Sequence, residues 1–117
     1  MSLPPLDRRI VILRQGPAVD DGFTDTPGPW QPLTRTWASF RAVSDGERVQ
    51  AQQVGADLTA RFQVQWTSVT ATVGGAHQIE LDGMRYAISG VKPIGRRRRI
   101  EFTATAATEL PPAEDQP

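Results

Sequence analysis

Apolar and polar residues alternate along most of this chain, and this period of two is the feature that most constrains its fold. In residues 59–66 the apolar face carries Phe62, Val64 and Trp66, and the residues between them are polar. Residues 100–106 alternate in the same way. Strands with one buried and one wet face are typical of antiparallel sheets. We therefore expect a mainly all-β protein.

The apolar pattern predicts six strands, and one of them, residues 9–14, is apolar on both faces and indicates a central or doubly covered strand. Four are expected at residues 9–14, 35–43, 59–66 and 100–106, and two more form a hairpin over residues 78–88. Asp82 and Gly83 suit the two-residue turn of that hairpin. A small six-stranded antiparallel β-barrel, closed or nearly closed, buries one face of each strand and leaves no long edge. We expect this barrel to form one domain, residues 1–109, followed by a disordered proline-containing acidic tail at residues 110–117.

A polar segment, residues 44–57, separates the second and third expected strands. Ser44 and Glu47 have the spacing of a capping box, and Gly55 is suited to end a helix. These signals predict a short helical insert between strands 2 and 3. A helix of about ten residues is marginal in water, and few apolar side chains are available to pack it. We therefore expect the insert to order against another surface.

The composition excludes several classes of protein. The chain of 117 residues has no cysteine, a single histidine (His77), and 13 Lys and Arg against 13 Asp and Glu. Thiolate metal sites and cysteine nucleophiles are therefore excluded, and the balanced charge argues against a dedicated nucleic-acid-binding protein. Asp20, Asp21 and Asp25 lack the spacing of a calcium loop. We expect no metal, no cofactor, no catalytic residues and no membrane-spanning segment.

Four consecutive arginines form the sharpest charge feature, and they are Arg96, Arg97, Arg98 and Arg99. One interpretation is a solvated turn that acidic neighbours partly neutralise. The alternative is contact with a DNA backbone or with the acidic face of a partner protein, because adjacent like charges gain from an anionic partner.

Two tryptophans pose a similar question. Trp37 shares the polar face of its expected strand with Arg41. There it either covers the barrel end or packs under the long first loop, or it anchors a neighbouring subunit. Trp30 lies in a segment rich in glycine and proline, residues 15–32, which we expect to be a long loop. Trp30, Trp37 and Arg41 are the candidate residues of a subunit or partner interface.

Several short motifs follow one another in a fixed order over residues 6–106. They are LDRRI at residues 6–10, Gly22, WA at residues 37–38, Gly46 and Glu47 with Ala51, TARF at residues 59–62, and DGMRYAI at residues 82–88. In this order they resemble the phage head–tail joining family, the head completion or stopper proteins of long-tailed phages, prophages and phage-like particles. Gln65 departs from the family, which often carries an arginine there.

The resemblance implies a β-barrel that assembles with itself as a ring of twelve subunits in the virion neck. For the isolated protein, before it docks on the particle, both a ring and a monomer fit the resemblance. Such rings lie below the portal and adaptor, extend the DNA channel, prevent genome leakage and dock the tail terminator or tail-tube proteins. The protein would be made in the bacterial cytoplasm. In relatives the connection between strands 2 and 3 closes the channel. The matching candidates here are Ser44, Glu47, Arg48, Gln50, Gln52 and Gln53.

Two other functions fit a small barrel. One is a tail terminator or another tail-completion protein. The other is an OB-like nucleic-acid-binding module, which needs exposed aromatic residues interleaved with basic ones on one sheet face. The expected outward faces carry mainly Gln, Thr and Glu, which favours the head completion role. An enzyme is the least supported class, since no catalytic set of residues is present.

Overall fold

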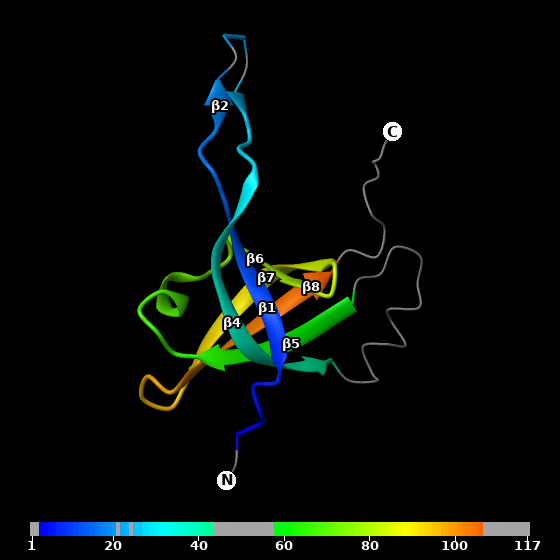
Figure 1. Ribbon diagram of the computed structural model, residues 1–117, viewed down its shortest axis with the longest axis vertical. Helices are drawn as coiled ribbons and strands as arrows, with labels where there is room; N and C mark the ends of the chain where they lie inside the picture. Colours follow the sequence, from blue (N-terminus) through cyan, green and yellow to red (C-terminus); the bar gives the residue numbers. More distant parts are fainter. Residues whose placement is uncertain (1–2, 21, 24, 44–57, 107–117) are drawn as a thin grey trace.

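Six strands of the chain close into one antiparallel β-barrel (Figure 1). The computed structural model describes residues 3–20, 22–23, 25–43 and 58–106. Around the barrel the strands follow the order β1 (Arg8–Gln15), β4 (Trp30–Ala42), β5 (Leu58–Gln65), β8 (Arg99–Ala106), β7 (Met84–Ile94) and β6 (Gln78–Leu81), and β6 pairs back to β1. The predicted six-stranded barrel is confirmed. The expected helical insert and the acidic tail lie outside the described residues.

The apolar face of each strand fills the interior of the barrel. The largest fully buried side chains are Phe62, Phe102, Ile10, Ile12, Ile79 and Val64. Phe62 makes edge-to-face contacts with Phe40 and Tyr86, with ring centroids 5.4 and 5.0 Å apart. Aromatic pairs in this geometry add to the free energy gained by burying their area. The alternation in the sequence therefore corresponds to an inside and an outside of the barrel.

The tight turn between β6 and β7 forms as the sequence predicts. Asp82 and Gly83 have φ angles of 52° and 82°. Positive φ at both central residues gives the local twist that a two-residue hairpin needs. β7 continues to Ile94, beyond the expected end of its strand at residue 88.

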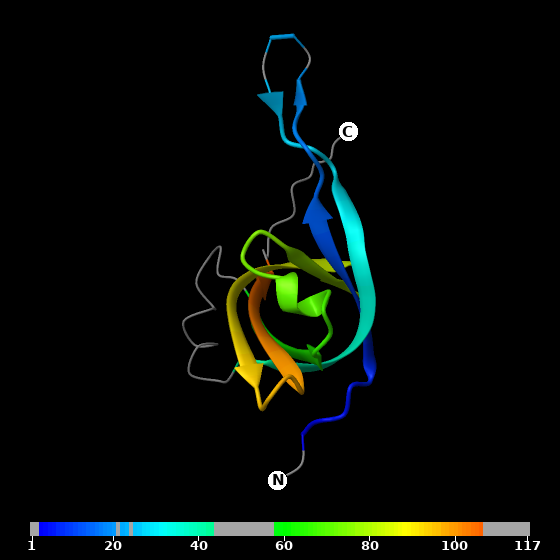
Figure 2. The same ribbon diagram turned by 90° about the vertical axis from the view of Figure 1, so that its left-hand side faces the viewer.

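The segment expected to be a long loop is instead a β-hairpin, which corrects that prediction. β1 and β4 remain paired up to Gln15 and Trp30, and a two-stranded sheet of β2 (Val19–Asp20) and β3 (Asp25–Thr26) lies beyond them. We call residues 15–30 the hairpin arm. It projects away from the barrel in both views (Figures 1 and 2). It has no barrel interior to fill, so its sequence carries no alternation that predicts strands.

Close backbone approach holds the base of the hairpin arm together. The amide of Gly16 donates to the carbonyl of Pro29 at 2.7 Å, and Gln15 Nε2 donates to the carbonyl of Gly28 at 3.0 Å. A Cβ on Gly28 would collide with the carbonyl oxygens of Pro17 and Gly16. Near the tip, Asp20 Oδ1 accepts from the amide of Gly22 at 2.9 Å, which gives that carboxylate a role in the turn.

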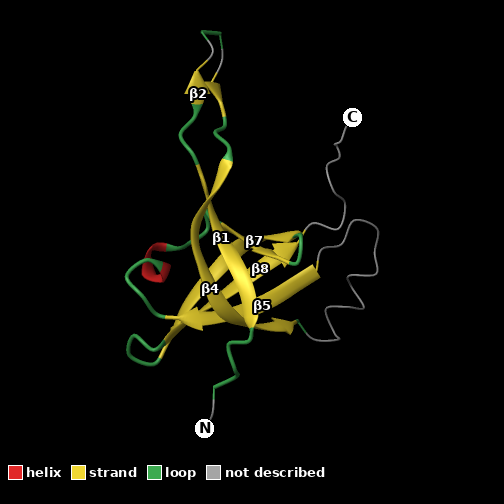
Figure 3. Cartoon of the chain, viewed as in Figure 1, coloured by secondary structure: helices red, strands yellow, loops and turns green. Residues whose placement is uncertain are grey.

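A short 3₁₀ turn, η1 (Thr70–Thr72), lies in the connection between β5 and β6 (Figure 3). Val73 beside it belongs to the core, and in Figure 2 the segment lies across one end of the barrel. His77 Nδ1 accepts from the amide of Gly74 at 3.1 Å, so this histidine stabilises the same connection. In the described part of the chain, no helix is long and apolar enough to cross a membrane.

Candidate functional site

The two ends of the barrel carry different connections. At one end, Leu58 of β5 lies opposite Ala106 of β8, and at the other end Gln65 lies opposite Arg99. Seven residue steps separate these pairs, a distance of about 23 Å along a strand. Residues 44–57 and 107–117 attach at the first end, which we call the insert end. The turn between β7 and β8 lies at the second end.

This turn contains three of the four consecutive arginines, and we call its residues 95–98 the arginine turn. Gly95 and Arg97 have φ angles of 67° and 54°. A positive φ is uncommon for a residue other than glycine. The amide of Trp66 donates to the carbonyl of Arg98 at 3.0 Å, and this bond ties the turn to the end of β5.

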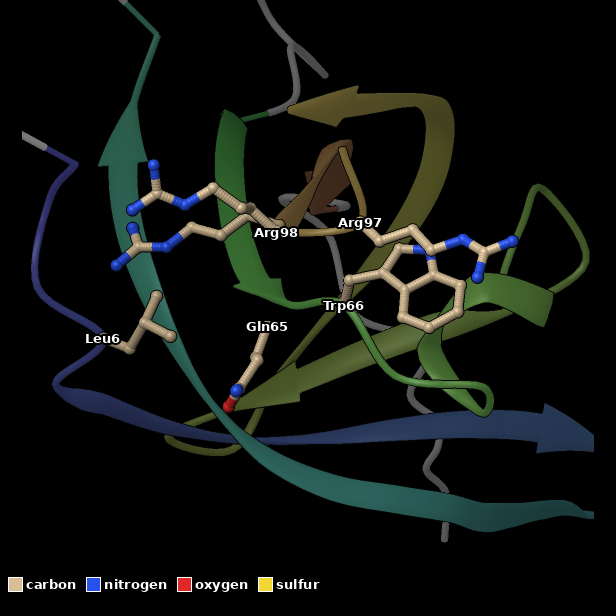
Figure 4. Close-up of a pocket in the computed structure, with 6 residues that line it drawn as sticks. Leu6, Gln65, Trp66, Arg97 and Arg98 are labelled. Carbon is tan, nitrogen blue, oxygen red and sulfur yellow. The ribbon is translucent and has the colours of Figure 1, made fainter. Parts of the chain in front are cut away.

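The four arginines do not act as one uniform patch. Arg99 is partly buried, donates to Gln63 Oε1 at 3.1 Å, and also donates to the carbonyl of Pro4. Arg97 places its guanidinium 5.2 Å from the centre of the Trp66 ring. Arg98 points in the opposite direction, towards the side of Leu6 (Figure 4). Arg96 is exposed.

No acidic group pairs with these arginines in the part of the chain that the structure describes. The ion pair found there joins Arg8 to Asp82 at 3.0 Å, and Asp82 lies in the β6–β7 turn, away from the arginine turn. The expected neutralisation by acidic neighbours is therefore not seen among the described residues.

An open pocket of about 440 Å³ lies beneath the arginine turn, and we call it the arginine pocket (Figure 4). Its lining comes from three parts of the chain and consists of Leu6, Gln65, Trp66, Arg97, Arg98 and Arg99. Arg99 holds the N-terminal segment that carries Leu6, through its bond to Pro4. The pocket combines apolar side chains with positive charge. Its chemistry suits a ligand that is apolar in one part and anionic in another.

A second basic surface lies on the outside of β1, β4 and β5. The guanidinium of Arg9 lies 5.2 Å from the centre of the Trp37 ring, and Trp37 is 49% exposed. Further along β4, Arg41 lies directly opposite Arg61 of β5. We call Arg9, Trp37, Arg41 and Arg61 the basic face. An exposed tryptophan among arginines is a composition enriched at the centres of protein interfaces.

The structure separates the three candidate interface residues. Trp37 and Arg41 lie on the same outer face of β4, as the sequence predicts. Trp30 is instead the first residue of β4, is partly buried, and pairs with Gln15 at the base of the hairpin arm. Six residues of extended strand lie between it and Trp37, so Trp30 does not belong to the basic face. Ser44, Glu47, Arg48, Gln50, Gln52 and Gln53 lie outside the described residues.

Sequence reasoning missed how the charge divides along the chain. The described residues carry twelve Lys and Arg against six Asp and Glu, a formal net charge of +6. The remaining residues carry one Arg against seven Asp and Glu, a formal net charge of −6. The net charge of zero is therefore the sum of a positive charge on the described residues and an equal negative charge on the rest of the chain. Counting charges segment by segment would have shown this division.

Together, these observations define a small closed β-barrel protein with a basic outer face and a basic pocket at one end. Residues 1–107 match the family of phage head completion proteins, and the chain belongs to that family. This match confirms the resemblance that the order of the sequence motifs indicated. A comparison with curated protein sequences finds no match.

Two solved structures share the fold. Protein SF1141 from Shigella flexneri 2a has a solution structure that superposes with a TM-score of 0.70 at 21% identity, covering 94% of this chain and 100% of that chain. A chain in the virion of a native gene transfer agent particle superposes with a TM-score of 0.66 at 20% identity, covering 90% of this chain and 97% of that one. At these identities the likeness shows the fold alone.

Proposed function

We propose that this protein is a structural, non-catalytic component of the virion neck that joins the DNA-filled head to the tail. It forms a ring with copies of itself, contacts the portal or adaptor proteins on one side and the tail terminator or tail-tube proteins on the other, and keeps the packaged genome from leaking. The family match over residues 1–107 carries this proposal. The exposed basic face and the arginine pocket supply contact surfaces that such a ring needs.

The gating role of the insert is part of the proposal. β4 and β5 are paired up to the point where the insert leaves the barrel, because Ala42 lies opposite Ala60 and the amide of Val43 donates to the carbonyl of Thr59 at 2.9 Å. The barrel is therefore closed at the base of the insert. Gln50, Gln52 and Gln53 of the insert are polar and uncharged, which suits a channel lining past which DNA moves without being held. Ser44, Glu47, Arg48, Gln50, Gln52 and Gln53 are the proposed gate residues.

Particle assembly with an altered insert tests this function. In one variant a five-residue Gly-Ser segment replaces residues 47–51, and in a second a two-residue Gly-Ser linker replaces them. We expect both variants to enter particles and both to lose packaged DNA, measured as the fraction of filled heads. If only the variant with the two-residue linker loses packaged DNA, gating depends on the length of the insert and not on the side chains of residues 47–51.

Two results would contradict the proposal at different levels. Unchanged DNA retention and tail attachment in both variants would refute the gate and leave a structural role in the neck. Absence of the wild-type protein from purified particles, measured by mass spectrometry, would refute the neck role itself.

The basic face favours a second candidate function, sequence-independent contact with DNA. Its exposed Trp37 and its arginines have the chemistry of a surface that binds nucleic acid by stacking and charge. Binding of a short DNA to the isolated protein, weakened by salt and by the double substitution R41Q/R61Q, would support this candidate. No DNA binding at low salt would remove it.

A further inference from the structure

The arginine pocket has the features of a binding site for a peptide that is both apolar and acidic. Trp66 and Leu6 supply apolar surface, while Arg97 and Arg98 supply guanidinium groups without an acidic partner among the described residues. Arginine binds carboxylates strongly because its planar guanidinium donates two parallel hydrogen bonds. Aromatic-lined grooves bind proline-rich segments, which are extended before they bind. A ligand for this pocket should therefore combine prolines, an aliphatic side chain and carboxylates.

The chain itself contains such a segment. Residues 109–115 read ELPPAED, with two adjacent prolines, one leucine and three carboxylates. The segment follows Ala106, and it contributes to the negative charge that complements the basic barrel. Leu110 and the prolines match the apolar part of the pocket, and Glu114 and Asp115 match its arginines.

The topology favours binding between two copies over binding within one. The tail leaves the barrel after Ala106, whereas the pocket lies beside Arg99, at the opposite end of β8. The two ends are about 23 Å apart. The eight residues from 107 to 114 span at most about 29 Å when fully extended. Reaching the pocket of the same copy would require an almost straight path along the outside of the barrel, whereas the pocket of a second copy imposes no such constraint.

We propose that the arginine pocket of one copy binds residues 109–115 of a second copy, head to tail. A donor segment at one end of a barrel and an acceptor pocket at the other make a heterologous contact, and heterologous contacts generate rings when the rotation between copies closes. The contact deepens the proposed function by naming one contact of the ring, and it rests on the proposed assembly of copies.

A paramagnetic label tests the contact directly, because the chain has no cysteine and an introduced one is unique. Full-length Q116C carrying a nitroxide is mixed with an equal amount of ¹⁵N-labelled wild-type chain. The three tryptophans give three indole N–H signals. We expect the Trp66 signal to lose at least half its intensity and the Trp30 signal, at the base of the hairpin arm, to keep its intensity.

Charge variants identify the groups involved. R97Q/R98Q in the ¹⁵N chain, or E114Q/D115N in the labelled chain, should restore the Trp66 signal. R14Q/R85Q removes the same amount of charge from two exposed arginines outside the pocket and should leave the broadening unchanged. The charge swap, R97E/R98E mixed with E114R/D115R, should bring the broadening back.

Three outcomes would overturn the proposal. The first is that the Trp66 signal does not broaden in the mixed sample. The second is that it broadens only when the nitroxide and the ¹⁵N label are on the same chain. The third is that the charge variants do not change the broadening. A short DNA duplex that shifts Trp66 in the wild type and not in R97Q/R98Q, with no broadening between chains, would assign the pocket to phosphate. The gate variants leave the pocket and residues 109–115 intact, so failure of this contact and failure of the gate are separate results.

Discussion

Four adjacent arginines show how much one residue step changes the role of a side chain. Arg99 is the first residue of β8 and holds the N-terminal segment through Pro4, whereas Arg97, in a left-handed conformation, lies over Trp66. Arg98 points to the other side of the turn (Figure 4). A run of four identical residues in the sequence therefore becomes one arginine bonded within the fold and three exposed ones.

Tyr86 gives a prediction about pH at the residue scale. Burial raises the pKa of its hydroxyl above the ordinary value of 10.0, an effect that Arg8 opposes and Asp82 adds to. The unfolded chain therefore releases this proton at a lower pH than the folded chain. The free energy of unfolding should be insensitive to Tyr86 below about pH 10 and fall as the pH rises further, by at most about 1.4 kcal/mol per pH unit.

Urea unfolding of the wild type and Tyr86→Phe at several pH values checks this prediction. Tyr86 is the only tyrosine, so phenolate absorbance reports its ionisation alone. The variant keeps Lys92, the only lysine, so the contribution of that group is common to both proteins. Equal slopes above pH 10 in the two proteins would contradict the prediction.

Arg41 gives a second prediction at the residue scale. It lies directly opposite Arg61, and like charges in cross-strand pairs are destabilising. We expect Arg41→Gln to raise the free energy of unfolding by about 0.2–0.5 kcal/mol at low salt, with a smaller gain at high salt. The same substitution should lower incorporation into particles. Arg14→Gln is the matched control, since Arg14 lies opposite the uncharged Gln31. An equal change in both variants would contradict the cross-strand explanation.

At the scale of elements, the hairpin arm shows that pairing can continue where packing stops. β1 and β4 share the barrel core in one half and extend beyond it in the other, where backbone hydrogen bonds and close contacts between glycine and proline segments hold them together. An isolated two-stranded hairpin is marginally stable. The hairpin arm is therefore expected to be only marginally stable without the contacts at its base, between residues 15–16 and 28–29.

Gly28→Ala tests this base. The new Cβ would clash with backbone atoms of Gly16 and Pro17, which cannot move aside as a flexible side chain can. We expect the Gly16 amide to exchange with solvent at least about tenfold faster, while the amides of β5 stay protected. Hydrogen exchange followed by NMR measures both. Gly74→Ala is the control, because nothing lies within 4 Å of its added Cβ. Unchanged protection of Gly16 would contradict the prediction.

At the scale of the whole molecule, the described residues and the rest of the chain have opposite formal charges, +6 and −6. Pairing continues around the entire barrel and up to both sides of the insert, so the fold does not depend on the insert for closure. The arginine pocket lies at the end of the barrel opposite to the one where the insert joins β5 at Leu58. One molecule can therefore contact different neighbours at its two ends.

Replacing residues 47–51 with the two-residue Gly-Ser linker tests whether the barrel folds independently of the insert. Loop shortening on this scale changes the closure free energy by less than about 0.6 kcal/mol, so the melting temperature should shift by less than about 5 °C. Thermal unfolding of the purified chain measures the shift. Phe62→Ala, which empties a fully buried site, should lower the free energy of unfolding by about 3–5 kcal/mol and shows that the assay detects core damage. A loss of that size in the insert variant would contradict the prediction.

Much of the fold could be predicted from the sequence because the barrel strands have one buried face. The alternating residues around Phe62 and Phe102 and the turn at Asp82 and Gly83 were identified correctly. The candidate site was less predictable. The arginine run was found, but the pocket that it lines with Trp66 and Leu6 was not, since these residues come from separate parts of the chain.

The sequence by itself determined the all-β fold class, the positions of the core residues and the family. The alternation of apolar and polar residues and the order of the motifs are local properties of the chain. Only the tertiary structure decided that residues 15–30 form a projecting hairpin, that Arg9 lies over Trp37, and that Arg99 bonds to Pro4 while Arg97 lies over Trp66. These features depend on strand register and barrel closure. Both arise from contacts between residues far apart in the chain, and no local pattern encodes them.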